Sequence, residues 1–178
     1  MKRRSLLGLV AVVASAPLQV HSHTPYQQWM VYRKKHLLIG CHREDLRTWE
    51  LAKEVTGVLD KELPDARARI ARAKTRGRLA SLLGTEQLQT ALLSPETAGN
   101  MVDGRNGFEP YGEIALKTLA VVEKHVLVCR ADFPKRHAWQ LAHALQGKYQ
   151  LNQRYLPQDV PMHPGALAMH DGQAIPDY

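Results

Sequence analysis

Six side chains that are suited to binding an anion lie just after three short apolar stretches of the chain: His42, Arg43, Thr75, Arg76, Ser94 and Thr97. If these stretches are neighbouring strands, the six side chains meet at the carboxyl edge of one sheet, where open α/β sheets bind their ligands. Backbone N–H groups at helix N-termini converge at the same edge and favour negative charge. Arg43 and Arg76 add positive charge, and Ser94 and Thr97 add hydroxyl donors. The pattern predicts a site for a small anionic solute or for a partner protein.

His23 offers a different chemistry if the chain is cut directly before it. Its free α-amine and its imidazole would then lie on one residue, and two such nitrogens chelate Cu(II). One further imidazole would complete the set, and the candidates are His36, His42, His125, His137, His143, His163 and His170. None of these histidines pairs with another at the spacing of a metal motif. We therefore expect no cofactor, and copper bound through His23 is the alternative hypothesis.

Cys41 and Cys129 each end an apolar stretch, so we expect both near the same edge of one sheet. A disulfide between them is one possibility, because an exported chain enters an oxidising compartment. Two buried free thiols are the other possibility.

Signals for catalysis are weak. Ser94 has the strand-to-helix position of a nucleophile elbow, but the surrounding TALLSPE lacks the glycines that such a turn needs. Cys41 and His42 are adjacent, which directs their side chains to opposite faces of a strand. The sequence has no Walker loop, dinucleotide fingerprint or His-Glu-x-x-His motif. We therefore expect a protein that is not an enzyme.

Residues 1–22 have the pattern of a secretory signal peptide. Three basic residues precede the apolar stretch LLGLVAVVASA, which is shorter than the roughly 20 residues of a membrane span. Cleavage after Ser22 is favoured over cleavage after Ala16, because Pro17 is a poor residue for a peptidase to accept. An uncleaved membrane tether is the alternative. The segment predicts a periplasmic protein.

The charge of the chain is mild once this segment is removed. The formal net charge is +7, and residues 1–22 hold three basic residues and no acidic one, which leaves +4. Nucleic-acid binding needs a denser basic patch with aromatic side chains beside it. The basic run from Arg67 to Arg78 is interpreted as a solvated face, and neither DNA nor RNA is expected as a partner.

Apolar periodicity predicts alternating strands and helices behind these candidate sites. Strands are expected at residues 36–41, 66–73, 89–94, 116–122 and 125–129. Helices are expected at residues 46–63, 76–83 and 95–102, and from Phe133 onwards. This alternation predicts an α/β fold, a single three-layer lobe with a mostly parallel sheet.

The chain divides into four predicted segments. The signal peptide (1–22) is followed by an N-terminal arm (23–35), the α/β lobe (36–154) and an extended tail (155–178) that packs on the lobe, with one helical turn after Pro164. The arm carries four large apolar or aromatic side chains. We favour their packing on the lobe over partner binding, because such side chains left in water promote aggregation.

The order of these motifs resembles one lobe of a type II periplasmic solute-binding protein. More narrowly, it resembles the TAXI-type receptors of TRAP transporters. The matching pieces are LLIG with the helix after it, RGRLASLLGTEQLQTALLS, HVLVCRADFP and LPQDVPMHPGALAMHDG, of which HPGA at residues 163–166 is the most specific. The resemblance covers most of residues 36–172 and implies a transport-related receptor.

The chain departs from that family in two places. After the crossover strand the family builds a second lobe, whereas here Arg130 to Asp132 lead directly into Phe133 and Pro134. The loop after the first strand is bulky and charged instead of glycine-rich. A single lobe supplies half of a site that closes over its ligand. The first expectation is therefore an exported, receptor-like binding or accessory protein, and the alternatives are a copper-binding protein and a structural subunit.

Overall fold

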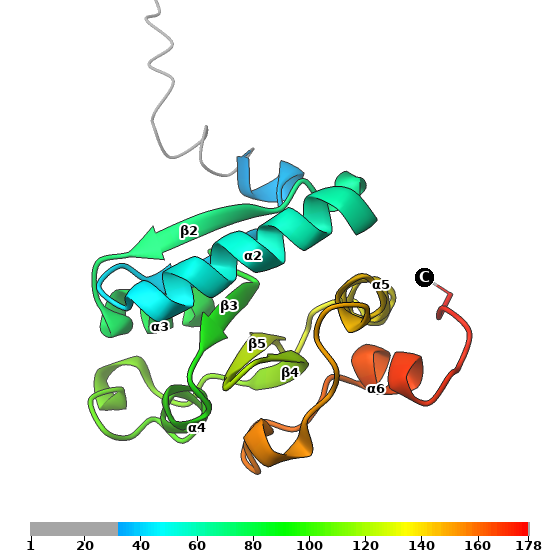
Figure 1. Cartoon of the computed structure of the whole chain (residues 1–178). Coiled ribbons are helices and arrows are strands. Elements are labelled where there is room, and N and C mark those ends of the chain that lie inside the picture. The colour runs from blue at the N-terminus through cyan, green and yellow to red at the C-terminus, as the bar shows by residue number, and fades with distance from the viewer. Residues whose placement is uncertain (1–31, 178) are drawn as a thin grey trace, which may run out of the picture.

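A mixed five-stranded sheet forms the centre of the protein (Figure 1). The computed structural model describes residues 32–177, and the strands are β1 (Leu38–His42), β2 (Arg69–Ala73), β3 (Thr90–Leu93), β4 (Leu116–Val122) and β5 (His125–Arg130). Their order is β2-β1-β3-β5-β4. β1 is parallel to β2 and β3, whereas β5 is antiparallel to both of its neighbours, β3 and β4. The predicted α/β fold is confirmed, and the sheet is mixed, with a parallel core formed by β2, β1 and β3.

Helices cover both faces of the sheet. α2 (Leu46–Glu62) and α5 (Lys135–Gln146) pack on one face, and α3 (Arg76–Gly84) and α4 (Pro95–Val102) pack on the other. α6 (Pro164–His170) lies beside α5 (Figure 1). Residues 32–35 are also helical, and three short 3-10 turns are present: η1 (Pro64–Ala66), η2 (Glu109–Tyr111) and η3 (Gln153–Tyr155). The two helical layers give two separate apolar cores, one on each side of the sheet.

β1 shows how alternation along a strand divides these cores. Ile39 and Cys41 belong to the α2 side, whereas Leu38 belongs to the α3 side. Gly40 also faces α3, and a Cβ added there would lie 2.7 Å from Leu79 Cδ1. Such a contact is too short for carbon atoms, so any larger residue at this position would force the Leu79 side chain to shift.

α2 is the longest helix of residues 32–177, and its sequence explains both ends and its buried face. Leu51, Val55 and Leu59 recur every four residues and are fully buried. The Asp45 carboxylate caps the N-terminus by accepting a hydrogen bond from the Thr48 N–H at 3.0 Å. Pro64 follows directly after the C-cap residue and prevents continuation. α2 therefore spans the sheet from its carboxyl edge to its amino edge.

The C-terminal residues are tied to β4 and α5. Thr118 in β4 exchanges backbone hydrogen bonds with this segment: its N–H donates to Pro161 O at 2.9 Å, and its C=O accepts from the His163 N–H at 2.8 Å. The Trp139 indole N–H donates to Gln173 O at 3.0 Å. These bonds hold residues 161–173 against the lobe.

Cys41 and Cys129 are buried free thiols, so the disulfide left open by the sequence is not formed. β3 lies between their strands, and two strand spacings of about 4.8 Å exceed the reach of a disulfide. The antiparallel direction of β5 also places Cys129 beside Thr90, at the start of β3, so the two cysteines do not share one edge of the sheet. Burial raises the pKa of the Cys41 thiol to about 11 and raises that of Cys129 further.

Some sequence-based predictions lie outside residues 32–177. They are the signal peptide with its cleavage site, His23, and all but the last residues of the arm. In the part of the chain that the structure describes, no helix has both the length and the apolar character needed to cross a membrane.

Candidate functional site

The structure brings the six predicted anion-binding residues to one edge of the sheet. β2, β1 and β3 are adjacent and parallel, so the residues that follow them emerge side by side at the carboxyl edge. The Arg43 N–H donates to Ala73 O at 2.8 Å and joins the exits of β1 and β2. The predicted set, His42, Arg43, Thr75, Arg76, Ser94 and Thr97, therefore lies along three neighbouring strand ends.

Three helices begin at this carboxyl edge, and a polar side chain caps each one. Besides Asp45 on α2, the Thr75 Oγ1 accepts from the Arg78 N–H at 3.0 Å on α3. The Ser94 Oγ accepts from the Thr97 N–H at 3.2 Å on α4, and the Ser94 hydroxyl donates to Thr97 Oγ1 at 2.8 Å. The hydroxyls predicted to bind a ligand therefore serve as helix caps. The N-terminal ends of the helix dipoles still favour an anion at this edge.

Four cationic side chains at this edge have no ion-pair partner among the described residues. Arg43, Lys74, Arg76 and Arg78 are exposed, and their side chains form no ion pair or hydrogen bond within residues 32–177. Arg72 on β2 is held differently, because its guanidinium stacks 4.4 Å from the centre of the Trp49 ring. The four unpaired cations, which we call the edge cations, surround the N-terminus of α3.

Tyr111 is a residue of this edge that sequence reasoning missed. It lies in η2 and its hydroxyl contacts the first turn of α3, because a Cβ added at Gly77 would be 2.2 Å from Tyr111 Oη. Gly77 is therefore required for this approach. The phenol is 41% exposed and so reaches solvent beside Arg76 and Arg78. The sequence signal for this contact was Gly77, which lies two residues after the cap residue Thr75.

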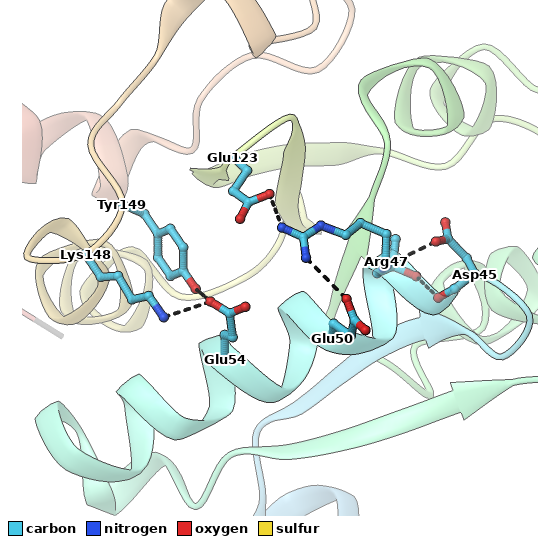
Figure 2. A network of polar contacts seen from close by, with 8 residues as sticks. Asp45, Arg47, Glu50, Glu54, Glu123, Lys148 and Tyr149 are labelled. Atoms are coloured by element: carbon cyan, nitrogen blue, oxygen red, sulfur yellow. Dashed lines mark hydrogen bonds and ion pairs between the residues drawn. The ribbon is translucent and has the colours of Figure 1, made fainter.

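On the α2 side of the sheet, by contrast, several charges form ion pairs (Figure 2). The Arg47 guanidinium donates to Glu123 in the β4–β5 turn and to Glu50 Oε2 at 3.2 Å. Glu54 accepts from Lys148 Nζ at 2.8 Å and from Tyr149 Oη at 3.4 Å. This pairing lowers the pKa of Glu54, with the Lys148 hydrogen bond as the main cause. The Arg47–Glu123 and Glu54–Lys148 pairs were not predicted, because they join segments far apart in sequence.

His125 lies close to these charged pairs at the start of β5. Its Nδ1 is buried and has no hydrogen-bond partner within the described residues. Burial lowers the pKa of the imidazole, which favours the neutral form. Asp45, Arg47 and Glu123 are the charges that act on it.

A cavity of about 720 Å³ lies at the opposite, amino edge of the sheet. It is bounded by residues 33–38, by the segment from Leu63 to Ala66, by the α3–β3 loop and by the start of α5. Sequence reasoning did not predict it, because four segments distant in sequence form its wall. A smaller cavity of about 310 Å³ lies beside Glu54 and Tyr149.

Within residues 32–177, no group of three histidine, cysteine or acidic side chains is arranged to hold a metal ion. His163 uses both ring nitrogens in hydrogen bonds, and His143 stacks on Trp139 with 5.0 Å between ring centres. His23, on which the copper alternative depends, lies outside this range.

The chain matches no protein-family model, no curated protein and no solved structure.

Proposed function

We propose that this chain is an exported, non-catalytic, receptor-like protein that binds an anionic group at the carboxyl edge of its sheet. One observation carries the proposal: the four edge cations lie unpaired where three helix N-termini converge. Unpaired cations repel one another, and an anion placed between them relieves that repulsion. A helix N-terminus adds about 0.3–1 kcal/mol for a bound negative charge.

The proposed relation to the TAXI-type receptors has two supports. A single sheet with helices on both faces is compatible with one lobe of a type II binding protein. The HPGA segment starts α6, where His163 caps the helix and Gly165 packs against the backbone of Lys135. The finer assignment to that family remains part of this proposal.

The openness of the edge bears on the class of ligand. The edge cations are all exposed, and in residues 32–177 no second sheet stands over them. A ligand at this edge therefore keeps part of its surface in water and gains less from desolvation than a ligand enclosed between two lobes. Two sources of the anionic group fit such a site: a small solute, or an acidic side chain on a partner protein.

The test is thermal unfolding of the protein with phosphate, sulfate or citrate, each compared with chloride at equal ionic strength. We expect one of the three anions to raise the melting temperature and Arg76→Ala to remove most of that increase. Arg69→Ala is the matched control, because Arg69 is an exposed arginine at the other end of β2 and pairs with Asp60 at 3.5 Å. Equal losses in both variants would contradict a specific site.

If none of these anions stabilises the protein, the small-solute form of the proposal fails. The partner form is then tested by co-purification of the wild-type protein and of Arg43→Glu/Arg76→Glu with one partner identified by chemical cross-linking at this edge. Loss of that partner in the double variant, with retention in Arg69→Glu, is the expected result. Retention in the double variant would reject the proposed function altogether.

A further inference from the structure

We propose that the amino-edge cavity is a second binding site, which takes a free amphipathic monoanion: a molecule with an apolar body and a single carboxylate or sulfonate. This inference goes beyond the anion site at the carboxyl edge and uses none of its residues. The volume of about 720 Å³ falls in the range of small-molecule sites, roughly 300–1,000 Å³.

The floor of the cavity is apolar. Leu37, Leu63, Phe133 and Leu141 line it, and all four belong to the apolar core between the sheet and the helices α2 and α5. Phe133 and Leu141 are almost completely buried, whereas Leu37 and Leu63 are half-buried. The floor is thus the end of that core, and it offers apolar surface that a ligand can remove from water.

One rim of the cavity is cationic. Arg33, Lys34 and Lys35 line it, and none of the three forms an ion pair within residues 32–177. Arg33 Nη2 donates to Gln87 Oε1 at 2.9 Å, which ties this rim to the α3–β3 loop across the cavity. The guanidinium is therefore held in place before any ligand arrives.

The acidic residues around the cavity do not cancel this charge. Glu86 pairs with Arg130 at 3.0 Å, so Asp65 is the remaining carboxylate of the lining. Three cations against one unpaired carboxylate favour an anionic head group at the rim. An apolar floor below a cationic rim matches a molecule that has both an apolar body and a negatively charged group. It does not match a compact anion such as sulfate.

The two sites therefore differ in chemistry. The carboxyl edge has exposed cations over helix N-termini, whereas the amino-edge cavity combines cations with the end of a core. A compact anion should prefer the former and an amphipathic anion the latter.

The experiment uses the full chain and the fluorescent probe 1-anilinonaphthalene-8-sulfonate, which has an aromatic body and one sulfonate. We expect saturable binding that decanoate displaces below its micellar concentration and that decanol, its neutral counterpart, displaces far less. Lys35→Glu should weaken the binding about fivefold, which is about 1 kcal/mol for one reversed charge near the surface. Lys124→Glu, an exposed lysine in the β4–β5 turn, is the matched control and should bind normally.

A second variant tests the cavity without changing its charge. Gln140 lines the cavity from α5 and is half-buried, so Gln140→Trp should fill the space and abolish probe binding while the melting temperature stays near that of the wild type. Arg76→Ala should retain full probe binding, which separates this site from the carboxyl edge. Equal displacement by decanol, normal binding by Gln140→Trp, or binding only in the presence of anionic vesicles would each overturn the proposal.

Discussion

His163 joins two helices through both nitrogens of its ring. The Nε2–H donates to Phe133 O at 2.9 Å, and Nδ1 accepts from the Gly165 N–H at 3.1 Å, so the neutral tautomer is required. The side chain is 1% exposed. Gly165 allows this contact, because a Cβ there would be 2.1 Å from Lys135 O. His163 and Gly165 together hold the start of α6 against the start of α5.

This geometry predicts a stability that depends on pH. Burial lowers the pKa of His163, helped by Lys117 and Lys135 and opposed by the hydrogen bond to Phe133. The unfolded chain therefore takes up a proton near the ordinary value of about 6.5 before the folded protein does. The contribution of His163 is complete above that pH and is lost as the pH falls below it.

Urea unfolding at pH 7.5 and pH 5.5 tests this prediction in the wild type and in His163→Asn. The asparagine keeps an acceptor for the Gly165 N–H but does not titrate. We expect a smaller loss of unfolding free energy between the two pH values in the variant. Some dependence remains, because burial also lowers the pKa of His125 and His170. An unchanged loss would show that His163 is not a source of the pH dependence.

At the scale of the elements, the N-terminus of α3 is both capped by Thr75 and proposed to bind an anion. Substitutions at Thr75 can separate these two roles. The Thr75 Oγ1 satisfies the Arg78 N–H, whereas the N–H groups of Arg76 and Gly77 precede it in the first turn. A ligand at the carboxyl edge therefore meets the first two N–H groups of the helix, and the cap holds the third.

Two substitutions at Thr75 distinguish these roles. Thr75→Ala removes the cap and should lower the unfolding free energy by about 1 kcal/mol, with anion binding retained. Thr75→Asp preserves the cap but adds a negative charge beside the edge cations, so it should keep the stability and abolish stabilisation by the anion. Urea unfolding with and without the stabilising anion measures both. Retained anion stabilisation in Thr75→Asp would contradict an anion site at this helix.

The bounds of the elements were largely predictable, because local signals mark them. Asp45, Ser94 and the prolines at 64, 95 and 164 stand at helix ends in the sequence and in the structure. The prediction for β2 began too early, at residue 66. The chain there forms η1 and then turns at Arg67, whose φ of 46° is left-handed, and the strand begins only at Arg69. A left-handed arginine has no sequence signature.

At the scale of the whole molecule, strand direction decided which predictions succeeded. The six residues of the carboxyl edge follow strands that are adjacent and parallel, so their convergence followed from the sequence pattern. The prediction that Cys41 and Cys129 share one edge of the sheet was wrong, because β5 runs the other way. An apolar stretch such as HVLVC carries no information about strand direction. Tyr111, the Arg47–Glu123 pair and the amino-edge cavity depend on long-range packing, which periodicity does not report.

The whole molecule therefore has two unlike edges on one sheet. The carboxyl edge carries unpaired cations over helix N-termini, and the amino edge carries a cavity that reaches the core. We propose that a compact anion binds at the first of these edges, the carboxyl edge.

The most direct test is a titration of the ¹⁵N-labelled protein with the sodium salt of whichever anion (phosphate, sulfate or citrate) raises the melting temperature, followed by amide chemical shifts, against sodium chloride at equal ionic strength. We expect saturable shifts that are largest at Arg43, Arg76 and Gly77 and absent in Thr75→Asp. Shifts centred on Lys35 and Gln87 at the amino edge, or shifts that rise without saturation over the whole surface, would contradict the proposal.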